Sequence, residues 1–135
     1  MREKAIRAFK KHDVIKEYLA WVSGMVVEPM TIDSPLLTIK KNNQSYSKVS
    51  EDGRPAISEV EPLEINGKRT KVKVVIKTGR THQIRVHLKS EGFPIIGDQV
   101  YGGRPNNRVL LHASKISLLG YTFESPEPRD FRLKN

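Results

Sequence analysis

The sequence lacks the residues that cross-link chains and the segments that enter membranes. None of its 135 residues is cysteine, which excludes disulfides, thiolate metal sites and cysteine nucleophiles and suits a reducing compartment. No apolar run approaches the ~18 residues that cross a bilayer, and no charged and then apolar leader opens the chain. We therefore expect a soluble, cytoplasmic protein with no membrane partner.

Acidic residues are scarce beside basic ones. Asp and Glu total 15 against 24 Lys and Arg, which leaves a net charge of +9. Such a surplus favours a polyanionic partner, because Lys and Arg that neutralise phosphates release the counterions condensed around them. A solvated basic surface without a partner is the plainer alternative, and composition does not decide between the two.

Motifs of the common metal and nucleotide sites are missing as well. On a helix, His82 and His87 lie about 140° apart, so they do not clasp one metal ion as an i, i+4 pair would. Gly102-Gly103-Arg104 is too short for a phosphate-cradling loop, and no Gly-x-Ser-x-Gly elbow is present. No metal site is therefore expected.

Short strands dominate the pattern that is present. Turn residues separate apolar or alternating runs, which predict strands at 14–22, 36–41, 45–49, 57–65, 71–77, 108–119 and 121–124. Asn66-Gly67 predicts a type I′ turn between two of these strands, and a short basic helix is predicted at 3–12. The pattern indicates an α+β fold in a single domain over 1–135, with helices packed on a mixed, mostly antiparallel sheet.

A second helix is predicted at 81–90. Thr81 is its expected N-cap, and Gly92 follows its expected end. Helical spacing directs Ile84 and Leu88 to one face, which we expect to be buried.

Alternation in the strand at 14–22 separates two faces. Ile15, Leu19 and Trp21 form the larger apolar face, which we expect to be the core face. Tyr18 then points to the opposite side, toward solvent or a cleft.

Four blocks of sequence occur in an order that a known family shares. They are KEYLAWVSG at 16–24, GRTHQIRVHL at 79–88, FPIIGDQVYG at 93–102 and RVLLHA at 108–113. Together they resemble the catalytic domain of RluA-type RNA pseudouridine synthases, and they cover most of the chain. The expected fold is therefore part of the pseudouridine synthase catalytic fold.

The resemblance implies an isomerase that breaks the N-glycosidic bond of a uridine in ribosomal or transfer RNA and rejoins the base through carbon 5. It also implies that no metal and no organic cofactor is needed. In this family the aspartate of a His-Arg-Leu-Asp segment attacks a nucleotide that has been flipped out of its stack, at a cost of ~a few kcal/mol. Tyr18 matches the family tyrosine that lies against the base, and Arg85 matches the arginine that pairs with the aspartate. A tyrosine that only packs and an arginine that is solvated or contacts phosphate are the plainer alternatives.

Five further residues are the expected RNA contacts, with a purely structural role as the open alternative: Lys16, Lys77, Arg80, His82 and Gln83. Lys71 and Lys73, together with Lys77, are expected on a solvated strand face, with RNA backbone contact as the second option. Asp98 is predicted to be a turn or capping carboxylate, since aspartate commonly bonds nearby backbone amides in turns. We expect RNA as the partner, ribosomal before transfer RNA, although no motif separates the two.

The segment of the nucleophile is where the sequence departs from the family. No His-Arg-Leu-Asp segment occurs in the 135 residues. We therefore expect a partial catalytic domain that lacks its N-terminal portion and is inactive alone. Without its carboxylate, Arg85 is expected to bind a stray anion or to open to solvent.

Three origins fit such a chain: a truncated enzyme, a piece completed by another chain, or a stand-alone, non-catalytic RNA-binding module of the family. The missing front predicts an uncovered apolar sheet face, and hence self-association or a complementing chain.

Overall fold

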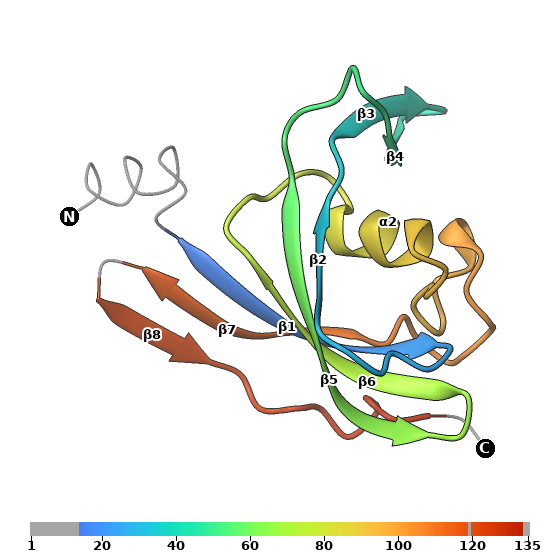
Figure 1. Cartoon of the computed structure of the whole chain (residues 1–135), viewed down its shortest axis with the longest axis vertical. Helices are drawn as coiled ribbons and strands as arrows, with labels where there is room; N and C mark the ends of the chain where they lie inside the picture. Colours follow the sequence, from blue (N-terminus) through green and yellow to red (C-terminus); the bar gives the residue numbers. More distant parts are fainter. Residues whose placement is uncertain (1–13, 119, 134–135) are drawn as a thin grey trace.

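The computed structural model describes residues 14–118 and 120–133, so the helix predicted at 3–12 lies outside the described residues (Figure 1). A six-stranded sheet has the order β2-β5-β6-β1-β7-β8, and each of its strand pairs is antiparallel. Its strands are β1 (Ile15–Ser23), β2 (Met30–Asp33), β5 (Ile57–Asn66), β6 (Arg69–Ile76), β7 (Leu111–Leu118) and β8 (Tyr121–Glu124). Within the described residues, a separate hairpin, one α-helix and one 3-10 turn complete the α+β fold: β3 (Leu36–Lys41), β4 (Gln44–Val49), α2 (Gln83–Ser90) and η1 (Gln99–Tyr101).

Two tight hairpins follow from their turn residues. Asn66 pairs with Arg69, so the β5–β6 turn consists of Gly67 and Lys68, one residue later than the predicted Asn66-Gly67 turn. Gly67 has φ 65°, which suits glycine at the first position of a two-residue loop. The β3–β4 hairpin (Figure 1) turns at 42–43, where two asparagines have φ values of 54° and 64°.

Helix α2 covers one face of the six-stranded sheet (Figure 1). Ile84 and Leu88 are buried against β1, β5 and β6, as their spacing predicts. The helix begins after His82, which occupies the N-cap with left-handed φ 50° and ψ 29°, so the predicted cap at Thr81 is wrong. Gly92 follows the helix with φ 87°, which confirms the predicted end.

The main core lies on the face of β1 opposite to the expected one. Ala20 and Val22 are fully buried in it beneath α2, and Tyr18 packs at its margin. Trp21 lies on the other face, in a smaller cluster that includes Phe131 of the C-terminal segment. Both faces of β1 are covered, so the face with the larger side chains is not the one that packs into the larger core.

Within the described residues, no helix is long and apolar enough to cross a membrane.

Candidate active site

A cleft of about 240 Å³ opens where β1 faces the loop that leads into α2. Six of the seven residues predicted for catalysis or RNA contact line it: Lys16, Tyr18, Arg80, His82, Gln83 and Arg85. Gly79, Ile76, Ile84 and Leu111 complete the wall. Lys77 is not among the residues that line the cleft. The fold therefore joins three of the four family blocks, those at 16–24, 79–88 and 108–113, at one place. The catalytic and RNA-contact roles stay predictions.

Tyr18 and Lys16 reach the cleft because both lie on the α2 side of β1. Burial raises the pKa of Tyr18 above its usual value, so its hydroxyl is protonated at neutral pH. The Lys16 Nζ lies 3.3 Å from where a Cβ on Gly79 would stand, so glycine leaves room for the lysine. Both residues also line a second cleft of about 270 Å³ against β7 and β8. Tyr18 thus stands between two hollows on one side of the sheet.

The Gln83 side chain shapes the loop at the mouth of the cleft. Its Oε1 accepts hydrogen bonds from the Thr78 hydroxyl at 2.8 Å and the Arg80 backbone N–H at 3.2 Å. Its Nε2 donates to the Ile57 carbonyl at 2.9 Å and the Ser58 hydroxyl at 3.1 Å. A side-chain amide has two donors and two acceptor sites, and all four are occupied. Gln83 therefore organises the loop, one of the two roles expected for it, and has no donor left for RNA.

A buried chain of hydrogen bonds continues from Ser58 to His87, which is fully buried. His87 Nε2 lies 2.8 Å from the Ser34 carbonyl oxygen, and Nδ1 lies 2.8 Å from the Ser58 Oγ. A carbonyl only accepts, so Nε2 carries the proton and Nδ1 accepts from the Ser58 hydroxyl. Burial lowers the pKa of His87, which favours this neutral ring. The chain ties α2 to β5 and to the β2–β3 connection.

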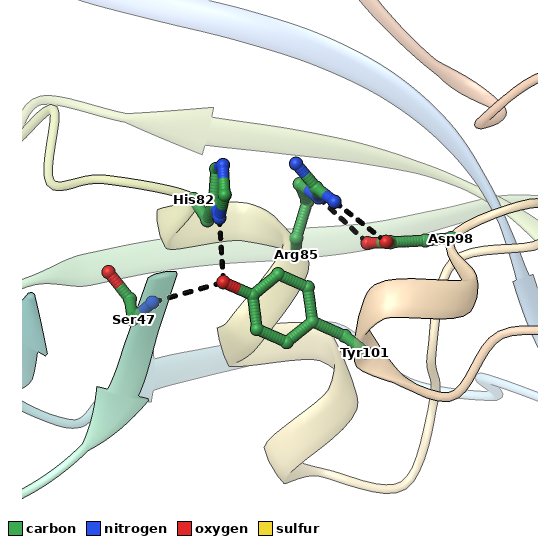
Figure 2. A network of polar contacts seen from close by, with 5 residues as sticks. All are labelled: Ser47, His82, Arg85, Asp98 and Tyr101. Carbon is green, nitrogen blue, oxygen red and sulfur yellow. Dashed lines mark hydrogen bonds and ion pairs between the residues drawn. The ribbon is translucent and has the colours of Figure 1, made fainter. Parts of the chain in front are cut away.

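His82 points from the start of α2 to Tyr101 of η1 (Figure 2). Its Nδ1 lies 2.6 Å from the Tyr101 hydroxyl, which also accepts the Ser47 backbone N–H at 3.0 Å. The Ser47 hydroxyl donates to the Thr81 carbonyl, so β4 holds this loop from outside. Burial and then the charge of Arg85 lower the pKa of His82. The Nδ1 of a neutral His82 can accept a hydrogen bond from the tyrosine hydroxyl.

Arg85 is paired within the chain, which contradicts the expected stray anion or open pocket. Its Nε and Nη2 donate to the Asp98 Oδ2 and Oδ1, both at 2.8 Å (Figure 2). The Asp98 side chain is 1% exposed and the Arg85 side chain 21%. Hydrogen bonding to Asp98 raises the pKa of Arg85.

The capping role predicted for Asp98 is also wrong. Asp98 does lie in a turn, but within the described residues its carboxylate makes no cap bond to η1. The reason is a tertiary contact: Arg85 of α2 lies against the buried carboxylate, and a hydrogen bond to a charged guanidinium is stronger than one to a backbone amide.

Tyr101 is a site residue that sequence reasoning missed, and Asp98 is one to which it assigned another role. Both belong to the GDQVYG stretch at 97–102, whose resemblance to the family was visible. The sequence did not show which residues Asp98 and Tyr101 contact, because these contacts join segments that are far apart in the chain. Within the described part of the chain, no three His, Asp or Glu side chains gather as metal ligands would.

Comparison with known proteins decides the family. The family model described as RNA pseudouridylate synthase matches residues 1–90. The chain belongs to this family. The predicted resemblance to RluA-type RNA pseudouridine synthases is thereby confirmed. A human protein titled RNA Pseudouridylate Synthase Domain Containing 1 superposes with a TM-score of 0.79 at 29% identity, over 96% of this chain and 60% of that one.

Two curated relatives show how much of a family member the chain represents. An uncharacterized RNA pseudouridine synthase of Helicobacter pylori strain J99 is 51% identical over 132 residues, which are 96% of this chain and 54% of the relative. Ribosomal large subunit pseudouridine synthase D of Haemophilus influenzae is 35% identical over 102 residues, which are 76% of this chain and 31% of the relative. The chain thus spans about half the length of the first of these relatives and less of the second.

Proposed function

We propose that this chain supplies the tyrosine and arginine of a pseudouridine synthase active site, which isomerises uridine in RNA once an aspartate is provided. One observation carries the proposal: residues from the family blocks at 16–24 and 79–88 line a single cleft, with Tyr18 and Arg85 in its wall. The membership of the family supports it.

The charge of the cleft suits an RNA nucleotide. Among the described residues that line it are the three cations Lys16, Arg80 and Arg85 and no carboxylate. Cations in a concave wall attract phosphate oxygens. The volume of about 240 Å³ lies below the ~300–1,000 Å³ of typical ligand pockets, which favours a single base over a larger ligand.

Tyr18 offers a flipped base an aromatic surface. Its ring packs at the margin of the core, and aromatic side chains are common stacking partners of flipped bases. Its raised pKa keeps the hydroxyl protonated, so at rest the group is a hydrogen-bond donor. A protonated hydroxyl cannot act as a base. For Tyr18 to remove the proton from carbon 5 of the base, its hydroxyl must therefore first lose its own proton.

We propose that the nucleophile comes from outside this sequence, because no His-Arg-Leu-Asp segment occurs in it and Asp98 is buried and already bound to Arg85. The unmatched portion of the Helicobacter pylori relative is the natural source to test, supplied as a second polypeptide. Tritium release from RNA labelled at carbon 5 of uridine measures the reaction. We expect release from the mixture and none from the chain alone.

A non-catalytic RNA-binding module is the second candidate, favoured by the absence of the His-Arg-Leu-Asp segment together with the cationic cleft. It predicts RNA binding by the chain alone, and no tritium release in any mixture. For either function we propose ribosomal RNA as the substrate class, because a relative is named for the ribosomal large subunit.

We further propose that the unmatched portion of the Helicobacter pylori relative covers the second cleft, between β1, β7 and β8. On edge strand β8, Tyr121 and Phe123 are 58% and 60% exposed. Exposed apolar side chains beside an open strand edge favour association. The isolated chain should therefore self-associate, and Phe123→Glu should reduce both self-association and binding of the second polypeptide. Sedimentation velocity measures both, and a wild-type chain that stays monomeric at high concentration would contradict the proposal.

A further inference from the structure

The turn at 97–103 has little freedom to change shape. A Cβ on Gly97, which has φ 90°, would stand 2.0 Å from the Arg108 carbonyl oxygen. A Cβ on Gly103 would stand 2.0 Å from the Ile95 carbonyl oxygen. Both positions therefore require glycine, and the turn holds Asp98 and Tyr101 toward α2.

These two side chains restrain Arg85 in different directions. Asp98 binds the guanidinium along one edge through two hydrogen bonds of 2.8 Å. Tyr101 lies against it with 5.1 Å between the Arg85 Cζ and the ring centroid. Tyr101 is itself 8% exposed and fixed at its hydroxyl by His82 and Ser47 (Figure 2). An edge contact and a contact with the ring together define the orientation of the guanidinium.

The pairing with Asp98 leaves part of the guanidinium available. Arginine has five N–H donors, and Asp98 uses one on Nε and one on Nη2. Within the described residues Nη1 makes no hydrogen bond, and Arg85 lines the cleft whereas Asp98 does not. The remaining edge can donate two parallel hydrogen bonds to a second carboxylate or to a phosphate.

We infer that Asp98 is a positioning residue that holds Arg85 so that its free edge meets a second acidic group in the cleft. This inference rests on the proposed function, in which that group is the incoming aspartate. Asp98 is not a nucleophile itself, because it is 1% exposed and both its oxygens are bound to Arg85. Because Arg85 is already oriented, its N–H donors need not reorganise when the incoming carboxylate binds.

Hydrogen exchange of the Arg85 Nε–H tests the positioning in the chain as it stands. Nitrogen-15 NMR should show a slowly exchanging Arg85 signal, and Asp98→Asn should speed its exchange by about tenfold or more. Asp98→Glu keeps the charge but moves the carboxylate, and should give an intermediate rate. Asp130→Asn is the matched control, because Asp130 pairs with Arg108 at 3.0 Å with its side chain 65% exposed. Unchanged Arg85 exchange in both Asp98 variants, with folding retained, would overturn the inference.

Steady-state kinetics in the mixture with the Helicobacter pylori portion separate positioning from a merely structural role. Asp98→Asn should lower kcat by about 10²-fold and leave the KM for RNA unchanged, since a misplaced catalytic group costs rate more than binding. Asp98→Glu should recover part of the loss, and Asp130→Asn should match wild type. A raised KM with unchanged kcat would overturn the inference. If the wild-type mixture does not turn over, the proposed function fails, and the exchange measurement alone decides the role of Asp98.

Discussion

At the scale of single residues, the Arg85–Asp98 pair is unequally buried, and this inequality determines what each substitution does. Asp98 is 1% exposed, whereas the Arg85 side chain is 21% exposed and reaches the cleft. Removing one member of a buried pair leaves the other charge uncompensated, but a partly exposed cation can turn to water. The cost of losing Arg85 should therefore exceed the cost of losing Asp98.

Arg85→Met should lower the free energy of unfolding by about 3–5 kcal/mol, because it leaves a buried carboxylate without a partner. Asp98→Ala should cost less, about 1–3 kcal/mol, since the exposed part of Arg85 can be solvated. The double variant Arg85→Met/Asp98→Leu should recover most of the loss. Urea unfolding measures all three, and a double variant no more stable than Arg85→Met would contradict this account.

His87 makes stability depend on pH. In the folded chain burial keeps its pKa below the usual value, whereas in the unfolded chain it takes up a proton near pH ~6.5. The unfolded state then binds more protons below that pH, so stability is fully present above it and falls as the pH falls toward the folded pKa. His87→Gln should flatten this decline, and His82 should retain a smaller part of it. Urea unfolding between pH 5 and 8 is the measurement, and an equally steep decline in His87→Gln would refute the assignment.

At the scale of elements, the predictions succeeded where a local rule decides and failed where tertiary contacts decide. The β5–β6 hairpin and the end of α2 at Gly92 follow from residues that tolerate positive φ, and these were predicted within a residue. The cap at Thr81 was wrong because the Ser47 hydroxyl binds its carbonyl and the helix begins only after His82.

The core face of β1 shows the same limit. Ala20 is small enough to lie beneath α2, and Trp21 is large enough to fill the shallower cluster on the other face. Alternation identifies two faces, but which one is covered by the helix depends on the whole fold. The partner of Asp98 was hidden for the same reason, since α2 and η1 meet only in the folded chain.

Substituting two glycines with positive φ distinguishes the cost of backbone strain from the cost of a steric clash. Gly67 has φ 65° with nothing within 4 Å of its Cβ position, whereas the Cβ of Gly97 would meet backbone. Gly67→Ala should cost about 1–2 kcal/mol of stability from the left-handed conformation alone. Gly97→Ala should cost a further ~1–3 kcal/mol or more from the clash and should shift the Arg85 Nε–H signal. Equal losses, or an unshifted Arg85 signal in Gly97→Ala, would show that the turn does not position Arg85.

At the scale of the whole molecule, a net charge of +9 does not say where RNA would bind, and we propose the cleft as the binding site. RNA affinity should fall with salt by a log–log slope of roughly −0.7 to −0.9 per phosphate contact. Arg80→Gln should reduce the slope by about one contact, and Lys77→Gln should leave it unchanged because Lys77 lies outside the cleft. Fluorescence anisotropy at several salt concentrations measures the slopes. Equal losses in both variants would mean that RNA binds the basic surface at large.

The family membership and the cleft are properties of this chain, and activity is a property of the site once it is complete. The chain spans about half of a longer relative, and it brings Tyr18 and Arg85 to one place. In the proposed mechanism Asp98 orients the arginine, and the second polypeptide supplies the nucleophilic carboxylate.

Tritium release from RNA labelled at carbon 5 of uridine tests this claim most directly, in the mixture of the chain and the unmatched portion of the Helicobacter pylori relative. The account predicts release by the mixture and none by either part. It predicts a loss of about 10²-fold or more in Tyr18→Phe and Arg85→Gln, and wild-type release in Lys77→Gln. Release by the chain alone that survives replacement of every aspartate in it, or wild-type release by both site variants in the mixture, would contradict it.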